Sequence, residues 1–95
     1  MDGQKIREWV ESNARGLLPQ MLFADDEIDH IAMCMHHIYR WYHEGYPIGH
    51  FLNAVVKNDF MTACVKADVI NQKALYLYAL FCANKIPGDY REKAK

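Results

Sequence analysis

Three residues of the types that bind zinc occur at helical spacing in the first half of the chain: His30, Cys34 and His37. Positions i, i+4 and i+7 share one side of a helix, and imidazole and thiolate are common zinc ligands. However, these positions spread over about 10 Å of helix axis, at a rise of about 1.5 Å per residue, so one ion rarely reaches all three. The chain offers no second ligand motif to complete such a site. We therefore expect no bound metal and no other cofactor. The alternative is a metal site formed by these three residues.

The same cluster contains the elements of a cysteine nucleophile, with Cys34 activated by either His30 or His37. A free cysteine beside an apolar helix seam is usually an inert small side chain, which is the competing interpretation. Ser12 is the only serine, so the sequence gives little support for a serine-based catalytic triad. No glycine-rich phosphate loop is present. The sequence therefore predicts a protein that is not an enzyme.

A polar face of the same predicted helix carries His36, Arg40 and His43, with Tyr39 beside them and Tyr46 just after the helix. An arginine can form the bidentate hydrogen bonds that phosphate prefers, and histidines would make binding depend on pH. Tyrosine rings are enriched at interfaces. Two interpretations stay open: a solvated surface, and a contact site for an acidic group or a nucleotide phosphate.

The segment 17–23 is too apolar for an ordinary linker, and Pro19 interrupts it. Such a segment must be covered, either by the chain's own core or by another subunit or partner. Leu18, Leu22 and Phe23 are its candidate contact residues.

Apolar residues recur at spacings of three and four along most of the chain, which predicts helices and no strand. Asp2 caps a first helix that ends by residue 16, and a long central helix covers about 25–43. Gly45 ends the long helix in the left-handed conformation, and Pro47 opens the next helix after a sharp turn. Further helices are predicted at about 48–57, 60–67 and 69–85. The expected fold is an all-α, compact bundle of about five helices, formed by residues 1–95 as a single domain.

The expected domain has three parts. Residues 1–24 form the N-terminal helix and the apolar connector, residues 25–87 form the helical core, and residues 88–95 are a polar tail that frays. The core is expected to centre on the long helix, whose buried seam is Ile28, Ile31, Met35, Ile38 and Tyr42.

Residues 46–75 carry three motifs: Pro-x-Gly-x-Phe-Leu-x-Ala-Val from Pro47, an Asn58-Asp59 turn, and an Ala-Asp-x-x-Asn helix start from Ala67. This pattern resembles a family of small uncharacterised helical proteins encoded by bacteriophages and prophages, and the resemblance covers about half the chain. It implies a phage or mobile-element origin and brings no activity with it. The motif residues all have structural explanations as helix starts, caps and turns, with Asn71 as a capping-box partner.

Composition narrows the class of partner. Hydrophobic residues make up 52% and aromatic residues 13% of the 95 residues, which is more apolar material than one small core holds and predicts a homo-oligomer. The net charge is −1, but residues 1–45 carry four Lys/Arg against eight Asp/Glu, and residues 46–95 carry seven against four. No basic stripe is present, so nucleic-acid binding is not expected.

Cysteine usage and hydropathy predict a location. The three cysteines form no CxxC pair and no closed disulfide set, which fits a reducing cytoplasm. No apolar stretch approaches the roughly 20 residues that a bilayer demands, so we expect neither an export signal nor a membrane contact.

Together these features predict a phage-encoded, non-enzymatic interaction protein that binds a host or phage protein in the bacterial cytoplasm. Inhibition of a bacterial immune protein, as a counter-defence factor, is one such role by analogy. The alternative is an oligomeric sponge that holds a nucleotide-like small molecule between subunits, with Arg40 and the neighbouring histidines and tyrosines as its contacts.

Overall fold

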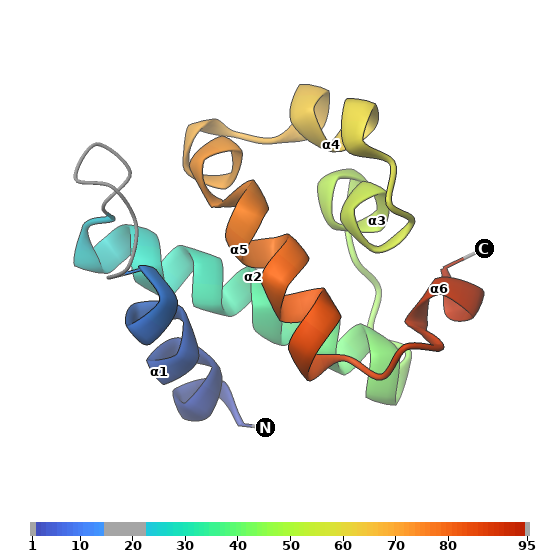
Figure 1. Cartoon of the computed structure of the whole chain (residues 1–95), viewed down its shortest axis with the longest axis horizontal. Helices are drawn as coiled ribbons and strands as arrows, with labels where there is room; N and C mark the ends of the chain where they lie inside the picture. The colour runs from blue at the N-terminus through green and yellow to red at the C-terminus, as the bar shows by residue number, and fades with distance from the viewer. Residues whose placement is uncertain (1, 15–22, 95) are drawn as a thin grey trace.

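The computed structural model describes residues 2–14 and 23–94, and every regular element in this part of the chain is an α-helix (Figure 1). The predicted all-α class is therefore confirmed. None of the described helices has the length and apolar character needed to cross a membrane. The helices are α1 (Gly3–Ala14), α2 (Asp25–Glu44), α3 (His50–Val56), α4 (Phe60–Lys66), α5 (Val69–Lys85) and α6 (Tyr90–Lys93).

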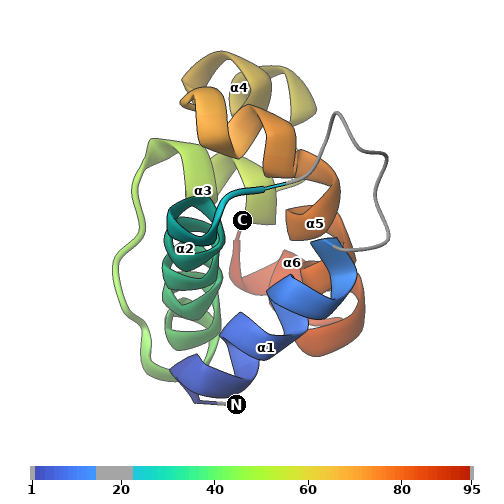
Figure 2. The ribbon, with the colours of Figure 1, turned by 90° about the vertical axis from the view of Figure 1, so that its left-hand side faces the viewer.

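Helix α1 begins where the sequence predicts, because the carboxylate of Asp2 accepts a hydrogen bond from the backbone N–H of Lys5 at 2.8 Å. Its apolar stripe, Ile6 and Val10, is fully buried and packs mainly against α2. An ion pair of 2.5 Å between Arg7 and Asp29 joins the exposed sides of these two helices. Figure 2 shows α1 lying across the lower part of α2 and α5.

Helix α2 is the long central helix of the prediction, and it contacts α1, α3 and α5. Most of its seam is buried as expected, with Ile31, Met35 and Ile38 fully enclosed, but Tyr42 is only half-buried at the edge of the core. At its start, Glu27 accepts a hydrogen bond from the backbone N–H of Ala24 at 2.9 Å. At its end, Gly45 adopts the left-handed conformation with φ 73°, which only glycine takes without cost.

The connection from α2 to α3 differs from the predicted sharp turn. Residues 45–49 form no helix, and α3 begins at His50 with Gly49 as its N-cap, so Pro47 does not open the helix. Figure 2 shows this connection running back beside α2. The fixed φ of proline suits an extended chain as well as a first helical turn, and the residue before a proline favours extended backbone. The side chain of Tyr46 packs on α2 and holds the connection there.

Helix α5 is capped by Asp68, whose carboxylate accepts from the backbone N–H of Asn71 at 2.8 Å, as the sequence predicts. The expected frayed tail is wrong, because residues 90–93 form α6, and Tyr90 and Ala94 are buried in the core. The hydroxyl of Tyr42 also donates a hydrogen bond to Asp89, just before α6. Two apolar residues four positions apart are too short a pattern for periodicity to reveal a helix.

Candidate functional site

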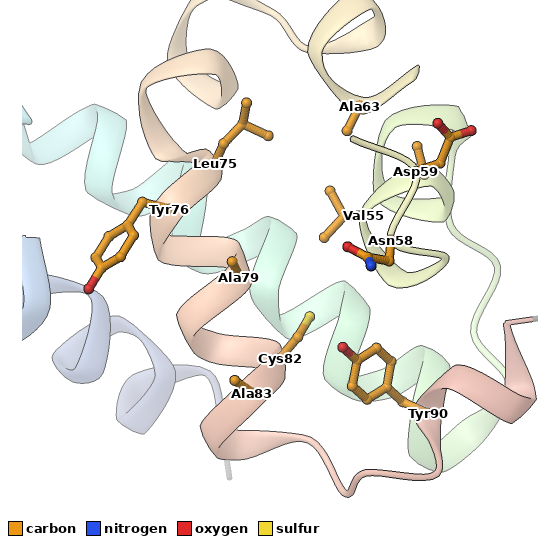
Figure 3. Close-up of a pocket in the computed structure, with 11 residues that line it drawn as sticks. Val55, Asn58, Asp59, Ala63, Leu75, Tyr76, Ala79, Cys82, Ala83 and Tyr90 are labelled. Atoms are coloured by element: carbon orange, nitrogen blue, oxygen red, sulfur yellow. The ribbon is translucent and has the colours of Figure 1, made fainter. Parts of the chain in front are cut away.

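An open, mostly apolar groove of about 460 Å³ lies between α5 and the pair formed by α3 and α4. Helix α4 packs closely on α3 and makes only sparse contact with α5, which leaves the space open. Figure 3 shows Val55 and Asn58 facing Cys82 across the groove, while the ring of Tyr76 points away from it. Helices α3 and α4 contribute Ala54, Val55 and Ala63, and α5 contributes Leu75, Tyr76, Ala79, Cys82 and Ala83.

The turn between α3 and α4 sets one wall of the groove. Asn58 adopts a left-handed φ of 61°, which asparagine tolerates better than most residues, and the backbone N–H of Asp59 donates to the carbonyl of Ala54 at 2.8 Å. The carboxylate of Asp59 caps α4 by accepting from the backbone N–H of Thr62 at 3.2 Å. Hydrogen bonding to Thr62 lowers the pKa of Asp59, and the nearby charge of Lys57 adds to this effect. The predicted turn residues thus fix the angle between α3 and α4.

Cys82 and Tyr90 close one end of the groove (Figure 3). Burial raises the pKa of the Cys82 thiol to about 11, so the group stays protonated at neutral pH and behaves as a small apolar side chain. The other polar side chains of the lining are Asn58 and Asp59 at the α3–α4 turn, Tyr90, and Tyr76, whose ring points away from the groove (Figure 3). The groove is therefore suited to apolar side chains of a binding partner.

Further exposed apolar or small side chains lie on the helices that border the groove. Met61 and Val65 lie four residues apart on α4 and are 75% and 77% exposed, the highest values among the large apolar residues described. On α5, Ala79 and Ala83 are exposed and small, so the backbone of a partner can approach the helix closely. Met61 and Val65 are each two residues from Ala63, which lines the groove, so they lie on the opposite face of α4 and form a separate exposed apolar patch.

Sequence analysis did not predict this groove. One signal was present, because α5 carries apolar residues around its whole circumference instead of along one stripe. Such a helix is either buried on all sides or leaves an apolar side without cover. The position of α3 and α4 beside α5, which decides between these outcomes, depends on tertiary packing that periodicity does not contain.

The predicted contact residues on α2 make two groups of ring contacts. The Tyr46 ring contacts both Arg40 and His37: the Arg40 guanidinium is 4.3 Å from the ring centre, and the His37 ring centre is 5.0 Å from it. Arg40 also pairs with Glu44 at 3.2 Å. Through its contact with the Tyr46 ring, Arg40 holds the 45–49 connection against α2.

A second group forms around His43. Its ring centre is 4.3 Å from that of Tyr39 and 4.8 Å from that of Tyr42. His36 lies beside the start of α1, where its Nδ1 is 3.4 Å from the point at which a Cβ on Gly3 would stand. The rings of α2 thus pack mainly on one another and on neighbouring segments.

The apolar connector is described only at its end. Phe23 is half-buried, packs against the core and lies 4.9 Å from the ammonium group of Lys73. This position agrees with the interpretation in which the connector covers its own core. Leu18 and Leu22 lie outside the described residues.

The three predicted zinc-type residues, His30, Cys34 and His37, do not come together in the structure. Cys34 Sγ lies 3.8 Å from His30 Nε2, but His37 packs on Tyr46. Burial, together with the charges of His36 and Arg40, lowers the pKa of His37. Over residues 2–14 and 23–94, no three His, Cys, Asp or Glu side chains are placed to hold one metal ion.

His30 also reaches Asp68, with 3.6 Å between Nε2 and the carboxylate, so Cys34, His30 and Asp68 look superficially like a catalytic triad. In a working triad the two ring nitrogens have separate partners, whereas here Nε2 faces both. Burial also raises the pKa of Cys34, which disfavours the reactive thiolate. This group therefore lacks the geometry and the ionisation of a nucleophile.

Comparisons with protein-family models, with curated proteins and with solved structures found no match. No relative supplies a function, and the groove between α5 and the α3–α4 pair is the feature of the described residues best suited to binding.

Proposed function

We propose that this chain is a non-enzymatic interaction protein that binds a host or phage protein through the groove between α5 and the α3–α4 pair. The observation that carries this proposal is the groove itself, about 460 Å³ of open, mostly apolar space lined by side chains of α3, α4 and α5. Its volume lies within the usual range of binding pockets, and its lining combines apolar side chains with a few polar groups. Covering these side chains would remove apolar area from water, which favours association.

The titratable groups support a binding role over a catalytic one. Catalytic sites usually adjust pKa values towards the working pH, but burial moves those of Cys34 and Cys82 away from it. The groove's acidic residue, Asp59, has its pKa lowered and acts as a helix cap. A general acid needs the opposite shift.

The biological setting rests on the motifs of residues 46–75. Their resemblance to phage-encoded proteins supports a phage origin, action in the bacterial cytoplasm and, by analogy, a counter-defence role. Self-association stays a prediction, because two of the three connector residues on which it depends lie outside the described part of the chain.

A nucleotide-like ligand is the less favoured candidate. It requires Arg40 to bind phosphate, yet the guanidinium is held between Glu44 and the Tyr46 ring. An incoming phosphate would have to displace the Glu44 carboxylate and would meet that carboxylate's negative charge. We therefore place protein binding ahead of the sponge.

Variants that block the groove test the proposed function. Ala79→Arg puts a long charged side chain into the groove, and arginine is a good helix former, so α5 should stay folded. Met33→Arg is the matched control, because Met33 is 48% exposed on α2 and does not line the groove. The tagged wild type and both variants are used as baits in bacterial lysate, and each recovered protein is then purified and its Kd measured by calorimetry.

We expect the wild type and Met33→Arg to bind the same purified partner, and Ala79→Arg to bind it at least about tenfold more weakly. Native mass spectrometry of the bait reports the number of subunits and any retained small molecule. Equal binding by Ala79→Arg, or a stoichiometric nucleotide in the purified protein, would contradict the proposal.

A further inference from the structure

We infer that the occupant of the groove is an acidic amphipathic helix of the partner protein. This inference rests on the proposed function and adds the chemistry of the partner. It follows from the shape of the groove and from the distribution of charge around it.

The dimensions fit a helix. The lining residues of α5 run from Leu75 to Ala83, which corresponds to about 12 Å of helix axis. This length matches about two turns of a partner helix, whose apolar anchors would lie at i, i+4 and i+7. Ala79 and Ala83 permit a close approach between the two helix axes.

The charge of the groove-bearing half is positive, with seven Lys/Arg against four Asp/Glu in residues 46–95. Three of these acidic groups already have intramolecular roles. Asp59 and Asp68 cap α4 and α5, and Asp89 accepts a hydrogen bond from Tyr42. The fourth, Glu92, also has an intramolecular contact. These contacts hold the four acidic groups in place without removing their charge, and the net charge of this half stays positive.

The lysines near the groove are in a different position. Lys57, Lys66 and Lys85 are exposed, and none lies within ion-pair distance of an acidic group among the described residues, although the charge of Lys57 acts on Asp59. Lys57 precedes the lining residue Asn58, Lys66 follows Ala63 by less than one turn of α4, and Lys85 follows Ala83 at the end of α5. An apolar groove whose three bordering helices each carry or end at an exposed lysine matches apolar anchors flanked by Asp and Glu.

The same charge distribution disfavours a symmetric dimer as the occupant. A two-fold contact through this groove would bring the positive half of one subunit against the positive half of another. A partner helix with acidic flanks avoids this repulsion.

Designed peptides test the inference with known probes. Two fluorescein-labelled helical peptides of about 18 residues share Leu at i, i+4 and i+7 and differ only in their flanking residues, Glu in one and Lys in the other. Fluorescence anisotropy at low salt gives their Kd for the wild type. We expect the Glu peptide to bind about tenfold more tightly than the Lys peptide, since several exposed ion pairs contribute modestly each.

Charge reversal gives the specific control. Lys57→Glu, Lys66→Glu and Lys85→Glu should each weaken binding of the Glu peptide, whereas Lys5→Glu, the same charge change on exposed α1, should not. The triple variant should prefer the Lys peptide. Circular dichroism melts confirm that each variant keeps its fold, and Ala79→Arg should bind neither peptide.

The possible failures are distinguishable. Equal binding of both peptides, lost in Ala79→Arg, would overturn the acidic character and leave the groove as the binding site. Binding of neither peptide by the wild type would overturn the helical occupant, while the proposed function is decided by the lysate partner and its dependence on Ala79. A wild-type dimer in sedimentation that Ala79→Arg converts to a monomer would make a second copy the occupant and overturn the inference.

Discussion

The hydroxyl of Tyr78 donates a 2.6 Å hydrogen bond to Oδ1 of Asn71, two turns earlier on α5, and both side chains are buried. Sequence analysis predicts Asn71 as a capping-box partner, and its backbone N–H does reach Asp68. The Asn71 side chain points inward instead, because Tyr78 needs a partner for its buried hydroxyl. Burial raises the pKa of Tyr78 well above its ordinary value, so this hydroxyl remains a donor.

Tyr78→Phe should therefore destabilise the fold by about 1–3 kcal/mol, since it leaves the Asn71 amide buried without this donor. Urea unfolding followed by circular dichroism measures the change. The double variant Tyr78→Phe with Asn71→Leu should recover part of the loss, because both polar partners are removed together. A single variant as stable as the wild type would show that water satisfies Asn71.

Ile31→Asp should abolish cooperative folding, because Ile31 is fully buried at the centre of α2 and an unpaired buried charge costs at least about 3 kcal/mol. Met33→Asp is the control, with a side chain that is 48% exposed on the same helix. Thermal melts should show a sharp transition for the control and none for Ile31→Asp. A variant that melts like the wild type would remove α2 from the core.

The success of the α2 prediction and the failure at Pro47 have the same physical basis. A seam of Ile28, Ile31, Met35 and Ile38 repeats long enough for its period to specify one buried face. Pro47 is a single residue whose fixed φ suits both a helix start and an extended chain, so only the packing of Tyr46 on α2 decides between them. Local caps at Asp2, Asp59 and Asp68 were predictable because their partners lie within one turn.

The groove and α6 were not predictable for a different reason. Both depend on residues far apart in the chain, such as Tyr42 with Asp89 or Val55 across from Cys82. No periodicity within one segment contains such pairings. The contacts of Arg40 were not predictable for the same reason, because they include Tyr46 on a connection whose path the sequence left open.

Cysteine modification should separate the three thiols. Cys64 is partly exposed, whereas Cys34 and Cys82 are buried and their pKa values are raised by burial, that of Cys82 to about 11. At pH 8 iodoacetamide should add one group to the native protein and three in urea, as counted by intact mass. Cys34 reacting faster than Cys64 at neutral pH would reveal an activated thiolate and revive the enzymatic hypothesis.

Acid should weaken the contact between α2 and α5. The pKa of Glu27 is lowered first by the hydrogen bond from the Ala24 N–H and then by Lys73, whose ammonium lies 3.1 Å away. A lowered pKa in the folded state means that the carboxylate stabilises the fold above its ordinary pKa of about 4.5, and that this contribution is lost as pH falls below that value. Glu27→Gln should reduce the urea midpoint at pH 7 and change it less at pH 3. An equal change at both pH values would assign the effect to packing instead of charge.

Truncation of the Tyr90 side chain tests whether α6 belongs to the core. Tyr90 is 9% exposed, lines the groove and belongs to the same buried cluster as Phe81 and Ile86, so Tyr90→Ala removes an aromatic ring from a packed site. Large aromatic-to-alanine changes in cores cost about 3–5 kcal/mol, and this site at the edge should fall near the lower value. Lys93→Ala on the exposed side of α6 is the control and should shift the urea midpoint little, because its contact is a single ammonium group 4.9 Å from the centre of the Tyr42 ring. If Tyr90→Ala unfolds at the wild-type midpoint, the C-terminal residues fray as the sequence predicts, and the groove is open at that end.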